Sequence, residues 1–231
     1  MDEEYEELYQ KVEEKHPWFV ARRALFGSLA GDDKTAAIID VGCGTGIFLQ
    51  HLKELGYQNV AGVETSDGMR RKFRDSTIGV FQKIPERQFA KLFLLDVLEH
   101  VQDDHDMLRE TFNVLRPGGQ LLLSVPAHPF LWSSHDETNR HFRRYRKREL
   151  REKLCSVGFI VERVSYWNMF LFPLCFLGRW LNGVGKGAGL EIGTPASFYI
   201  YGRLLCLENW LFRIVNLPIG VSLISVASKP G

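Results

Sequence analysis

Residues Ala36–Gly46 read AAIIDVGCGTG, an apolar run that ends in three glycines at alternate positions. Continuous apolar runs of this kind are typical of strands buried on both faces of a parallel sheet. Glycines at the end of such a strand allow backbone conformations that a side chain would forbid, and they let a ligand approach the backbone closely. The helix expected next, over Ile47–Leu55, offers unpaired N–H groups at its start. This stretch therefore predicts a ligand site at the carboxyl end of a buried strand.

The alternation of strand and helix continues along the chain. Further strands are expected at Asn59–Glu64, Ile78–Phe81, Lys91–Leu98, Gln120–Ala127, Phe159–Tyr166 and Val221–Lys229. Further helices are expected at Asp67–Asp75, Asp103–Leu115 and Arg148–Val157. Strands that alternate with helices predict a Rossmann-like α/β fold, here a seven-stranded, mostly parallel sheet with helices on both faces.

The chain divides into three parts. Residues 1–35 read as two helices, Asp2–Lys15 and a second that begins at Pro17, and residues 36–166 and 217–231 form the sheet core. Residues 167–216 are too many for a structureless loop, so they predict a helical cap inserted between the sixth and seventh strands. The glycine-rich segment Asn182–Gly193 is expected to be a flexible hinge between the two halves of the cap.

Composition limits the function and the compartment. The 29 basic and 28 acidic residues nearly cancel, which argues against a nucleic-acid partner. The four cysteines contain no C-x-x-C pair, so we expect a reducing, cytoplasmic location. The acidic start does not resemble a signal peptide. The apolar run Trp167–Leu181 is shorter than the roughly 20 residues of a membrane-spanning helix. The oligomeric state stays open.

The expected ligand is a nucleoside that carries positive charge. Glu64 closes the second strand, where a carboxylate can accept two hydrogen bonds from a ribose diol. A dinucleotide fingerprint would need its third glycine at position 47, where Ile47 stands. Asp40, just before the glycine turn, is a poor neighbour for a pyrophosphate. S-adenosylmethionine carries a sulfonium and an ammonium and no phosphate, so the electrostatics favour it over a nicotinamide dinucleotide.

Four motifs resemble, in order and spacing, those of class I S-adenosylmethionine-dependent methyltransferases. They are IIDVGCGTG, GVETS, LLDVLEHVQDD and LRPGGQLLLSVPA, and the resemblance covers roughly Ala36–Tyr166. It implies a methyltransferase whose cofactor-binding residues are Arg22, Asp40, Gly42, Cys43, Gly44, Gly46, Glu64, Thr65, Asp96, Val97 and His100. The sequence departs from the family pattern at Ala90, where an aspartate usually follows phenylalanine, and at Gln82, where an acidic residue often reads the adenine.

The resemblance also implies roles for these residues. The three glycines line the methionine part of the cofactor, and Asp40 orients the turn. Glu64 holds the ribose hydroxyls and Thr65 lies near the adenine. Asp96 lies beside the methionine part, with His100 just behind it. An amino-terminal helix often covers the cofactor in this fold, so Arg22 is expected to meet the cofactor carboxylate.

The segment after the fifth strand, AHPFLWSSHDETNRHFRRYRKREL, is rich in histidine and arginine. In an open α/β sheet such a segment lies over the ligand crevice. It resembles a subset of these methyltransferases in which a histidine is followed by Arg-Arg-Tyr, here His141 and Arg143–Tyr145. The same subset carries an aromatic His-x-Trp-Phe near its start, here His16–Phe19.

Three interpretations of the histidines compete. A general base removes a proton from an acceptor hydroxyl near neutral pH, and His135 and His141 are the candidates. A metal site from His128, His135, Asp136 and His141 would suit a catechol-type acceptor, but this spacing matches no known pattern, so we predict no metal. The third interpretation is that these side chains hydrogen-bond a long loop into place.

Trp18, Arg143, Arg144 and Tyr145 are the candidate acceptor contacts. Guanidinium groups pair bidentately with phosphate or carboxylate, so Arg143 and Arg144 favour an anionic acceptor. The alternative is that the basic cluster over 140–148 is a solvated helix face paired with glutamates. Trp18 and Arg22 lie four residues apart and share a helix face, and packing alone explains Trp18 equally well.

The cap is unusually apolar for two helices. Its large apolar side chains include Phe170, Leu171, Phe172, Leu174, Phe176, Leu177, Trp180, Phe198, Tyr199, Trp210, Leu211 and Phe212. A surplus of such side chains forms a greasy pocket or a surface patch, and large patches usually mark binding. This composition predicts an apolar or lipid-linked acceptor and a peripheral membrane contact through the cap.

The sequence thus predicts a methyltransferase for a small-molecule or lipid-linked acceptor, methylated at oxygen, nitrogen or carbon. The alternatives are a catalytically silent module or partner subunit that binds S-adenosylmethionine and, with less support, a nicotinamide-dependent oxidoreductase. A nucleic-acid methyltransferase would need a basic face, and only the cluster over 140–148 supplies one.

Overall fold

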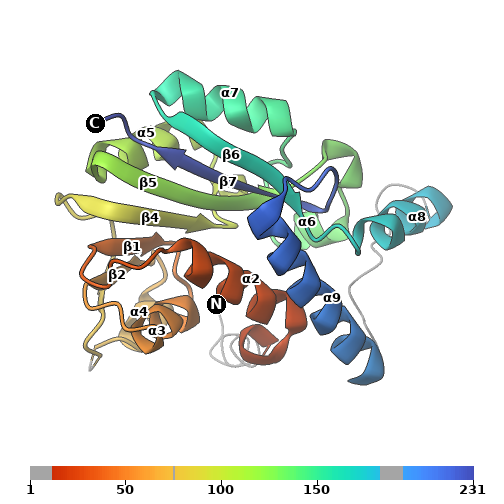
Figure 1. Cartoon of the computed structure of the whole chain (residues 1–231), viewed down its shortest axis with the longest axis horizontal. Helices are drawn as coiled ribbons and strands as arrows, with labels where there is room; N and C mark the ends of the chain where they lie inside the picture. Colours follow the sequence, from red (N-terminus) through yellow and green to blue (C-terminus); the bar gives the residue numbers. More distant parts are fainter. Residues whose placement is uncertain (1–11, 75, 183–194) are drawn as a thin grey trace.

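A computed structural model describes residues 12–74, 76–182 and 195–231 of the chain. Its centre is a seven-stranded sheet in the order β3-β2-β1-β4-β5-β7-β6 (Figure 1). The strands are β1 (Ile38–Val41), β2 (Val60–Val63), β3 (Gly79–Phe81), β4 (Phe89–Leu95), β5 (Leu115–Pro126), β6 (Ile160–Trp167) and β7 (Ser222–Ser228). Only β7 runs against its neighbours, between β5 and β6. The predicted mostly parallel sheet is confirmed.

The helices cover both faces of the sheet (Figure 1). They are α2 (Pro17–Leu29), α3 (Ile47–Glu54), α4 (Asp67–Arg71), α5 (Asp104–Val114), α6 (Ser134–Thr138), α7 (Lys147–Val157), α8 (Phe172–Asn182) and α9 (Pro195–Ile214), with short 3-10 turns η1 (Leu98–His100) and η2 (Pro129–Leu131). Alternate strand residues face opposite layers. Phe93 packs with α2, α3 and α9, whereas Leu94 packs with α5 and α7.

Two expected elements end three or four residues earlier than predicted. The fourth strand ends at Leu95 rather than Leu98, because Asp96 takes a positive φ of 57° and the chain turns into η1. The helix expected over Asp67–Asp75 ends at Arg71. The short helix α6 was not predicted, because five residues carry too little periodicity to identify a helix.

In the chain, helices α8 and α9 follow β6 and precede β7, which is the segment where the cap was expected. Helix α9 packs along α2, and its Leu205 and Phe212 are fully buried in the core of that layer (Figure 1). Asn209 joins the parts, because its Nδ2 donates to the Ala21 carbonyl at 2.8 Å and its Oδ1 accepts from Trp167 Nε1 at 2.9 Å. Helix α8 instead extends away from the sheet (Figure 1).

The ends of the predicted N-terminal and cap segments are only partly described. Of the helix expected over Asp2–Lys15, residues 12–15 are described and are helical. Most of the predicted hinge Asn182–Gly193 lies outside the described residues. A helix that crosses a bilayer needs about 20 apolar residues, and none of the described helices meets this requirement.

Candidate functional site

A cavity of about 350 Å³ opens at the carboxyl edge of the parallel strands. Its walls come from segments far apart in the chain: the region before and within α2, the turn after β1, the ends of β4, β5 and β6, and the beginning of β7. Of the predicted site residues, it is lined by Trp18, Arg22, Asp40, Gly42, Cys43, Gly44, Asp96, His100, His135, His141 and Arg144. The structure thus brings the cofactor candidates and the histidine candidates to one cavity.

The glycine turn after β1 is built for close approach. Gly44 has a φ of 52°, and a side chain added there would meet none of the described residues within 4 Å, so they leave the turn open at this position. Gly46 has a φ of 76°, and an added Cβ would collide with the ring of Phe73. Gly44 therefore leaves room for a ligand, whereas Gly46 is required by the packing of its own loop. Gly46 itself does not line the cavity.

Glu64 lies directly behind this turn. Its Oε2 accepts a hydrogen bond from the Gly44 N–H at 2.9 Å, and its Oε1 accepts one from the Ser66 N–H at 2.8 Å. The carboxylate therefore fixes the turn to the end of β2. Glu64, Thr65 and Val97 do not line the cavity, so their predicted cofactor contacts stay predictions.

Two buried carboxyl groups, those of Asp40 and Glu13, lie at the glycine end of the cavity. Asp40 is 3% exposed, and its Oδ1 has no hydrogen-bond partner among the described residues. Burial raises the pKa of Asp40 to about 8, Arg22 opposes this, and Glu13 and Glu64 add to it. Glu13 lines the same wall, and burial raises its pKa as well. Burial thus disfavours the charged forms of both carboxyl groups, and a cationic ligand at this end of the cavity would stabilise them.

Sequence reasoning missed Glu13. It lies in the acidic segment EEYEELYQKVEEK, where nothing distinguishes one glutamate from the others. Only the fold shows that this glutamate is buried and that its Oε2 accepts a hydrogen bond from the Thr45 hydroxyl, 32 residues further along the chain. The periodicity of the helix expected over Asp2–Lys15 does not distinguish Glu13 from the other glutamates.

Arg22 forms an ion pair with Asp96 across the cavity. Its guanidinium also lies 4.7 Å from the centre of the Trp18 ring and 5.2 Å from that of Phe19. Asp96 takes a positive φ, a strained backbone that is often associated with functional sites. The predicted contact of Arg22 with a cofactor carboxylate stays a prediction, since the structure pairs this arginine with Asp96.

A buried aspartate orients one of the two candidate histidines. His141 Nδ1 lies 2.9 Å from Asp136 Oδ1, and Arg144 Nε donates to the same oxygen at 2.7 Å. The second oxygen of Asp136 accepts from the backbone N–H and the hydroxyl of Ser133. Burial alone would raise the pKa of Asp136, but the hydrogen bonds from His141 and Arg144 hold it well below its usual value. Asp136 is therefore ionised and keeps Nδ1 of His141 protonated.

Two predicted acceptor contacts lie outside the cavity. Arg143 donates to the carbonyls of Val101 and Gln102 and pairs with Asp104 at 3.0 Å. Tyr145 is fully buried, and its hydroxyl donates to Asp104 at 2.9 Å. Neither residue lines the cavity. Both fix the loop after β5 to the segment at the start of α5, and their predicted acceptor contacts stay predictions.

Three side chains at the cavity, those of Glu99, His100 and His141, are of the types that bind metal ions. Candidate ligand atoms of Glu99, His100 and His141 lie within 4.8 Å of one another. Glu99 is 1% exposed, and its Oε2 has no partner among the described residues. The four-residue set weighed from the sequence is not the one that meets here: His128 stacks on Tyr166 and does not line the cavity.

Asn168 is a second cavity residue that sequence reasoning missed. Asn168, at the end of β6, is 1% exposed and takes a φ of 62°. Its Oδ1 accepts a hydrogen bond from the Tyr201 hydroxyl at 3.2 Å, whereas its Nδ2 has no partner in the described part of the chain. In the sequence this asparagine only interrupts an apolar run and belongs to no recognised motif, so its place beside the cavity could not be predicted.

Comparisons with known proteins agree with this architecture. Residues 9–164 match the family model described as a methyltransferase domain. A ubiquinone biosynthesis O-methyltransferase of Pseudomonas fluorescens (strain Pf0-1) is 28% identical over an alignment of 101 positions, which covers 38% of this chain and 43% of that protein. The chain thus spans less than half the length of this curated relative.

Solved structures share the fold. A S-adenosylmethionine-dependent methyltransferase of Archaeoglobus fulgidus superposes with a TM-score of 0.59 at 17% identity, covering 96% of this chain and 99% of that one. Phosphoethanolamine N-methyltransferase 2 of Haemonchus contortus, solved with S-adenosyl-L-methionine, gives a TM-score of 0.57 at 18% identity, over 90% and 52% of the two chains. The predicted fold is confirmed by these likenesses.

Proposed function

Because this chain belongs to the methyltransferase-domain family, we propose that it transfers a methyl group from S-adenosylmethionine to a phenolic hydroxyl of an apolar, lipid-linked acceptor. The family and the fold assign the cofactor. The observation that carries the acceptor proposal is the Asp136–His141 pair in the wall of the cavity, opposite the acidic glycine turn.

The glycine end of the cavity fits the cofactor on this chain's own geometry. The unpartnered Oδ1 of Asp40 offers an acceptor for a cationic group, and the open position at Gly44 leaves room for a ligand beside the turn. Asp40 and Gly42–Gly44 would hold the methionine part, and Glu64, next to them, would hold the sugar. When bound, the cofactor supplies a methyl group activated by a positively charged sulfur.

His141 is the proposed general base. Since its Nδ1 donates to Asp136, Nε2 is the ring nitrogen that can accept a proton. Such a base typically contributes about 10²–10⁴-fold to the rate. A phenolic hydroxyl, with a pKa near 10 in the case of tyrosine, is far easier to deprotonate than an alkyl alcohol. The O-methyltransferase name of the curated relatives also favours oxygen as the methylated atom.

Part of the cavity wall is apolar. Pro126, Leu131, Leu171, Cys175 and Val221 line it, next to the polar Ser133, Asn168 and Ser222. Holding an apolar ring against this wall excludes water and orients the hydroxyl, and orientation of this kind can supply about 7–11 kcal/mol of the catalytic effect. Arg144, which lines the cavity beside Asp136, is the remaining cationic contact for an acceptor with negative charge.

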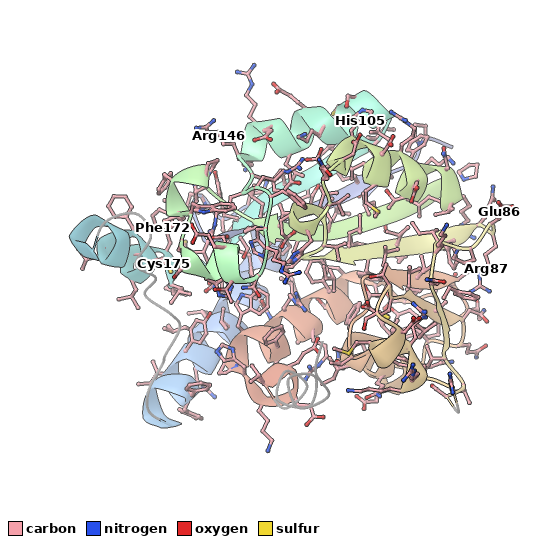
Figure 2. All side chains as sticks on the ribbon, turned by 180° about the vertical axis from the view of Figure 1, so that it is seen from behind. Glu86, Arg87, His105, Arg146, Phe172 and Cys175 are labelled. Atoms are coloured by element: carbon pink, nitrogen blue, oxygen red, sulfur yellow. The ribbon has the colours of Figure 1, made fainter. Side chains whose placement is uncertain are left out.

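The outer face of α8 supports a lipid-linked acceptor. Leu174, Phe176 and Leu177 are 65%, 49% and 48% exposed, and the ring of Phe176 lies 6.2 Å from that of Phe130. Figure 2 shows Phe172 and Cys175 where α8 meets the body of the molecule. Because the same helix contributes to the cavity wall, an acceptor tail could pass from the cavity to a membrane surface. We call Phe130, Leu174, Phe176 and Leu177 the outer patch.

The test is methyl transfer from labelled S-adenosylmethionine to a series of 4-alkylcatechols. We expect a labelled methyl ether, with kcat/KM rising by up to about fourfold for each added methylene, since each buried methylene contributes about 0.8 kcal/mol. Binding of S-adenosylhomocysteine without transfer to any member would support the silent binding module instead. A rate that does not depend on chain length would contradict the apolar, lipid-linked acceptor.

A further inference from the structure

A residue from outside the glycine turn completes its acidic wall. Glu13 precedes α2, yet its carboxyl reaches the turn after β1, where the Thr45 hydroxyl donates to Oε2. The segment is anchored on both sides of the side chain: Arg23 donates to the Glu13 carbonyl at 3.3 Å, and the His16 ring accepts from the Trp18 N–H at 3.2 Å. Glu13 is 7% exposed and lines the cavity, so its direction is set by the fold.

The charge around Glu13 favours a cationic partner. Glu13 and Asp40 line the same cavity, and the charge of Glu13 helps to raise the pKa of Asp40. Glu64 from β2 adds to the negative charge, whereas Arg22 and Arg23 from α2 oppose it. Arg22, which also lines the cavity, pairs with Asp96. Two buried carboxyl groups in such a place are costly unless a cation joins them.

We propose that Glu13 and Asp40 together bind the α-ammonium group of the cofactor, so that the segment before α2 closes the site on its amino-acid part. An ammonium group has three N–H donors and needs acceptors in different directions, whereas a sulfonium has none to offer. Glu13 Oε1, Asp40 Oδ1 and the backbone at Gly42–Gly44 provide acceptors from two sides. This inference rests on the proposed function and assigns Glu13 a part in it.

The decisive test compares two ligands by calorimetry. S-adenosylhomocysteine keeps the α-ammonium, whereas 5′-methylthioadenosine keeps the nucleoside and lacks the amino-acid part. We expect Glu13→Gln to weaken S-adenosylhomocysteine by about 10- to 100-fold, as the loss of a charge-assisted hydrogen bond does. Binding of 5′-methylthioadenosine should change less than about twofold. Glu14→Gln, at the exposed neighbouring position, should change neither.

Each outcome decides one point. Equal weakening of both ligands by Glu13→Gln would reduce Glu13 to a structural support for Thr45 and would overturn the proposal. No weakening of either would overturn it as well. A wild-type protein that binds neither ligand would instead refute the proposed function itself.

A second measurement uses the unaltered protein. Burial raises the pKa of Asp40 to about 8, so this carboxyl group is largely protonated at neutral pH, and burial raises the pKa of Glu13 as well. A cation placed between them lowers both pKa values, so binding must release protons to the buffer. Calorimetry in buffers of different ionisation enthalpy should show proton release with S-adenosylhomocysteine and none with 5′-methylthioadenosine. Equal release with both ligands would contradict the proposal.

Discussion

The two ends of the cavity are built in different ways. The backbone of the glycine end is local, because a strand, a turn and a helix within Ile38–Glu54 bring it together. Two carboxyl groups from elsewhere contact the turn, Glu64 after the next strand and Glu13 before α2. The acceptor end is assembled from side chains of the loop after β5, the end of β6 and helix α8. Here long-range pairs such as Arg143–Asp104, rather than strand pairing, hold the shape.

This difference has consequences for function. A site made of backbone and glycine binds the same ligand in many proteins, because few side chains are free to vary. A site made of loop side chains can change its ligand while the sheet stays the same. The glycine end should therefore respond to substitution through cofactor affinity and stability, and the acceptor end through turnover.

Removing the base should act on turnover alone. We expect His141→Ala to lower kcat by about 10²–10⁴-fold, since it removes the proton acceptor, and to leave the affinity for S-adenosylhomocysteine unchanged. The measurement is labelled methyl transfer together with calorimetry. His105→Ala, on the exposed face of α5 (Figure 2), is the matched control and should change neither quantity. A parallel loss of cofactor affinity in His141→Ala would break the separation.

The glycine turn should respond through stability. Gly46→Ala places a methyl group against the Phe73 ring at a positive φ, so we expect the free energy of unfolding to fall by about 2–4 kcal/mol. Gly44→Ala meets no neighbour within 4 Å and carries only the backbone strain, about 1–2 kcal/mol. Urea unfolding measures both. Equal losses would show that packing against Phe73 does not distinguish the two glycines.

Asp40 should lower the free energy of unfolding and raise the affinity for the cofactor. Its folded pKa of about 8 lies above the usual value of 3.8, so the folded state holds more protons than the unfolded state between these values. Stability from this group is therefore lost as the pH rises from about 4 to about 8. We expect Asp40→Asn to remove that slope and to raise the free energy of unfolding at pH 7 by about 1–3 kcal/mol.

The same variant should bind S-adenosylhomocysteine about 10-fold more weakly or worse, because a cationic group loses its partner. Urea unfolding across this pH range and calorimetry are the two measurements. A variant as pH-dependent as the wild type would assign the slope to another group, such as Glu99, whose pKa burial also raises.

The outer patch should give the smallest effect. Phe176→Ser should weaken binding to phosphatidylcholine–phosphatidylglycerol vesicles by about threefold to tenfold, because an aromatic side chain of this exposure contributes about 1 kcal/mol of apolar contact. Ile160→Ser is the control, since Ile160 is 56% exposed at the other end of β6. Sedimentation with vesicles measures both. If the two substitutions act equally, the outer patch is not the membrane contact.

The sequence predicted the glycine end well and the acceptor end only in outline. Asp40 and Gly44 could be recognised because their neighbours in the chain are also their neighbours in space. His141 and Arg143 lie two residues apart in similar surroundings, yet one lines the cavity and the other fixes a loop. That outcome depends on Asp136 and Asp104, which reach them only in the folded chain. Glu13 and Asn168 carried no local pattern at all.

The position of β7 in the sheet determines when the sheet can be completed during synthesis of the chain. All seven residues of this strand, the last in chain order, pair with β5 on one side and with β6 on the other. During translation, the edges of β5 and β6 that pair with β7 therefore stay unpaired until Ser222–Ser228 have left the ribosome. A nascent chain that pauses before this strand would expose edges of the kind that templates aggregation.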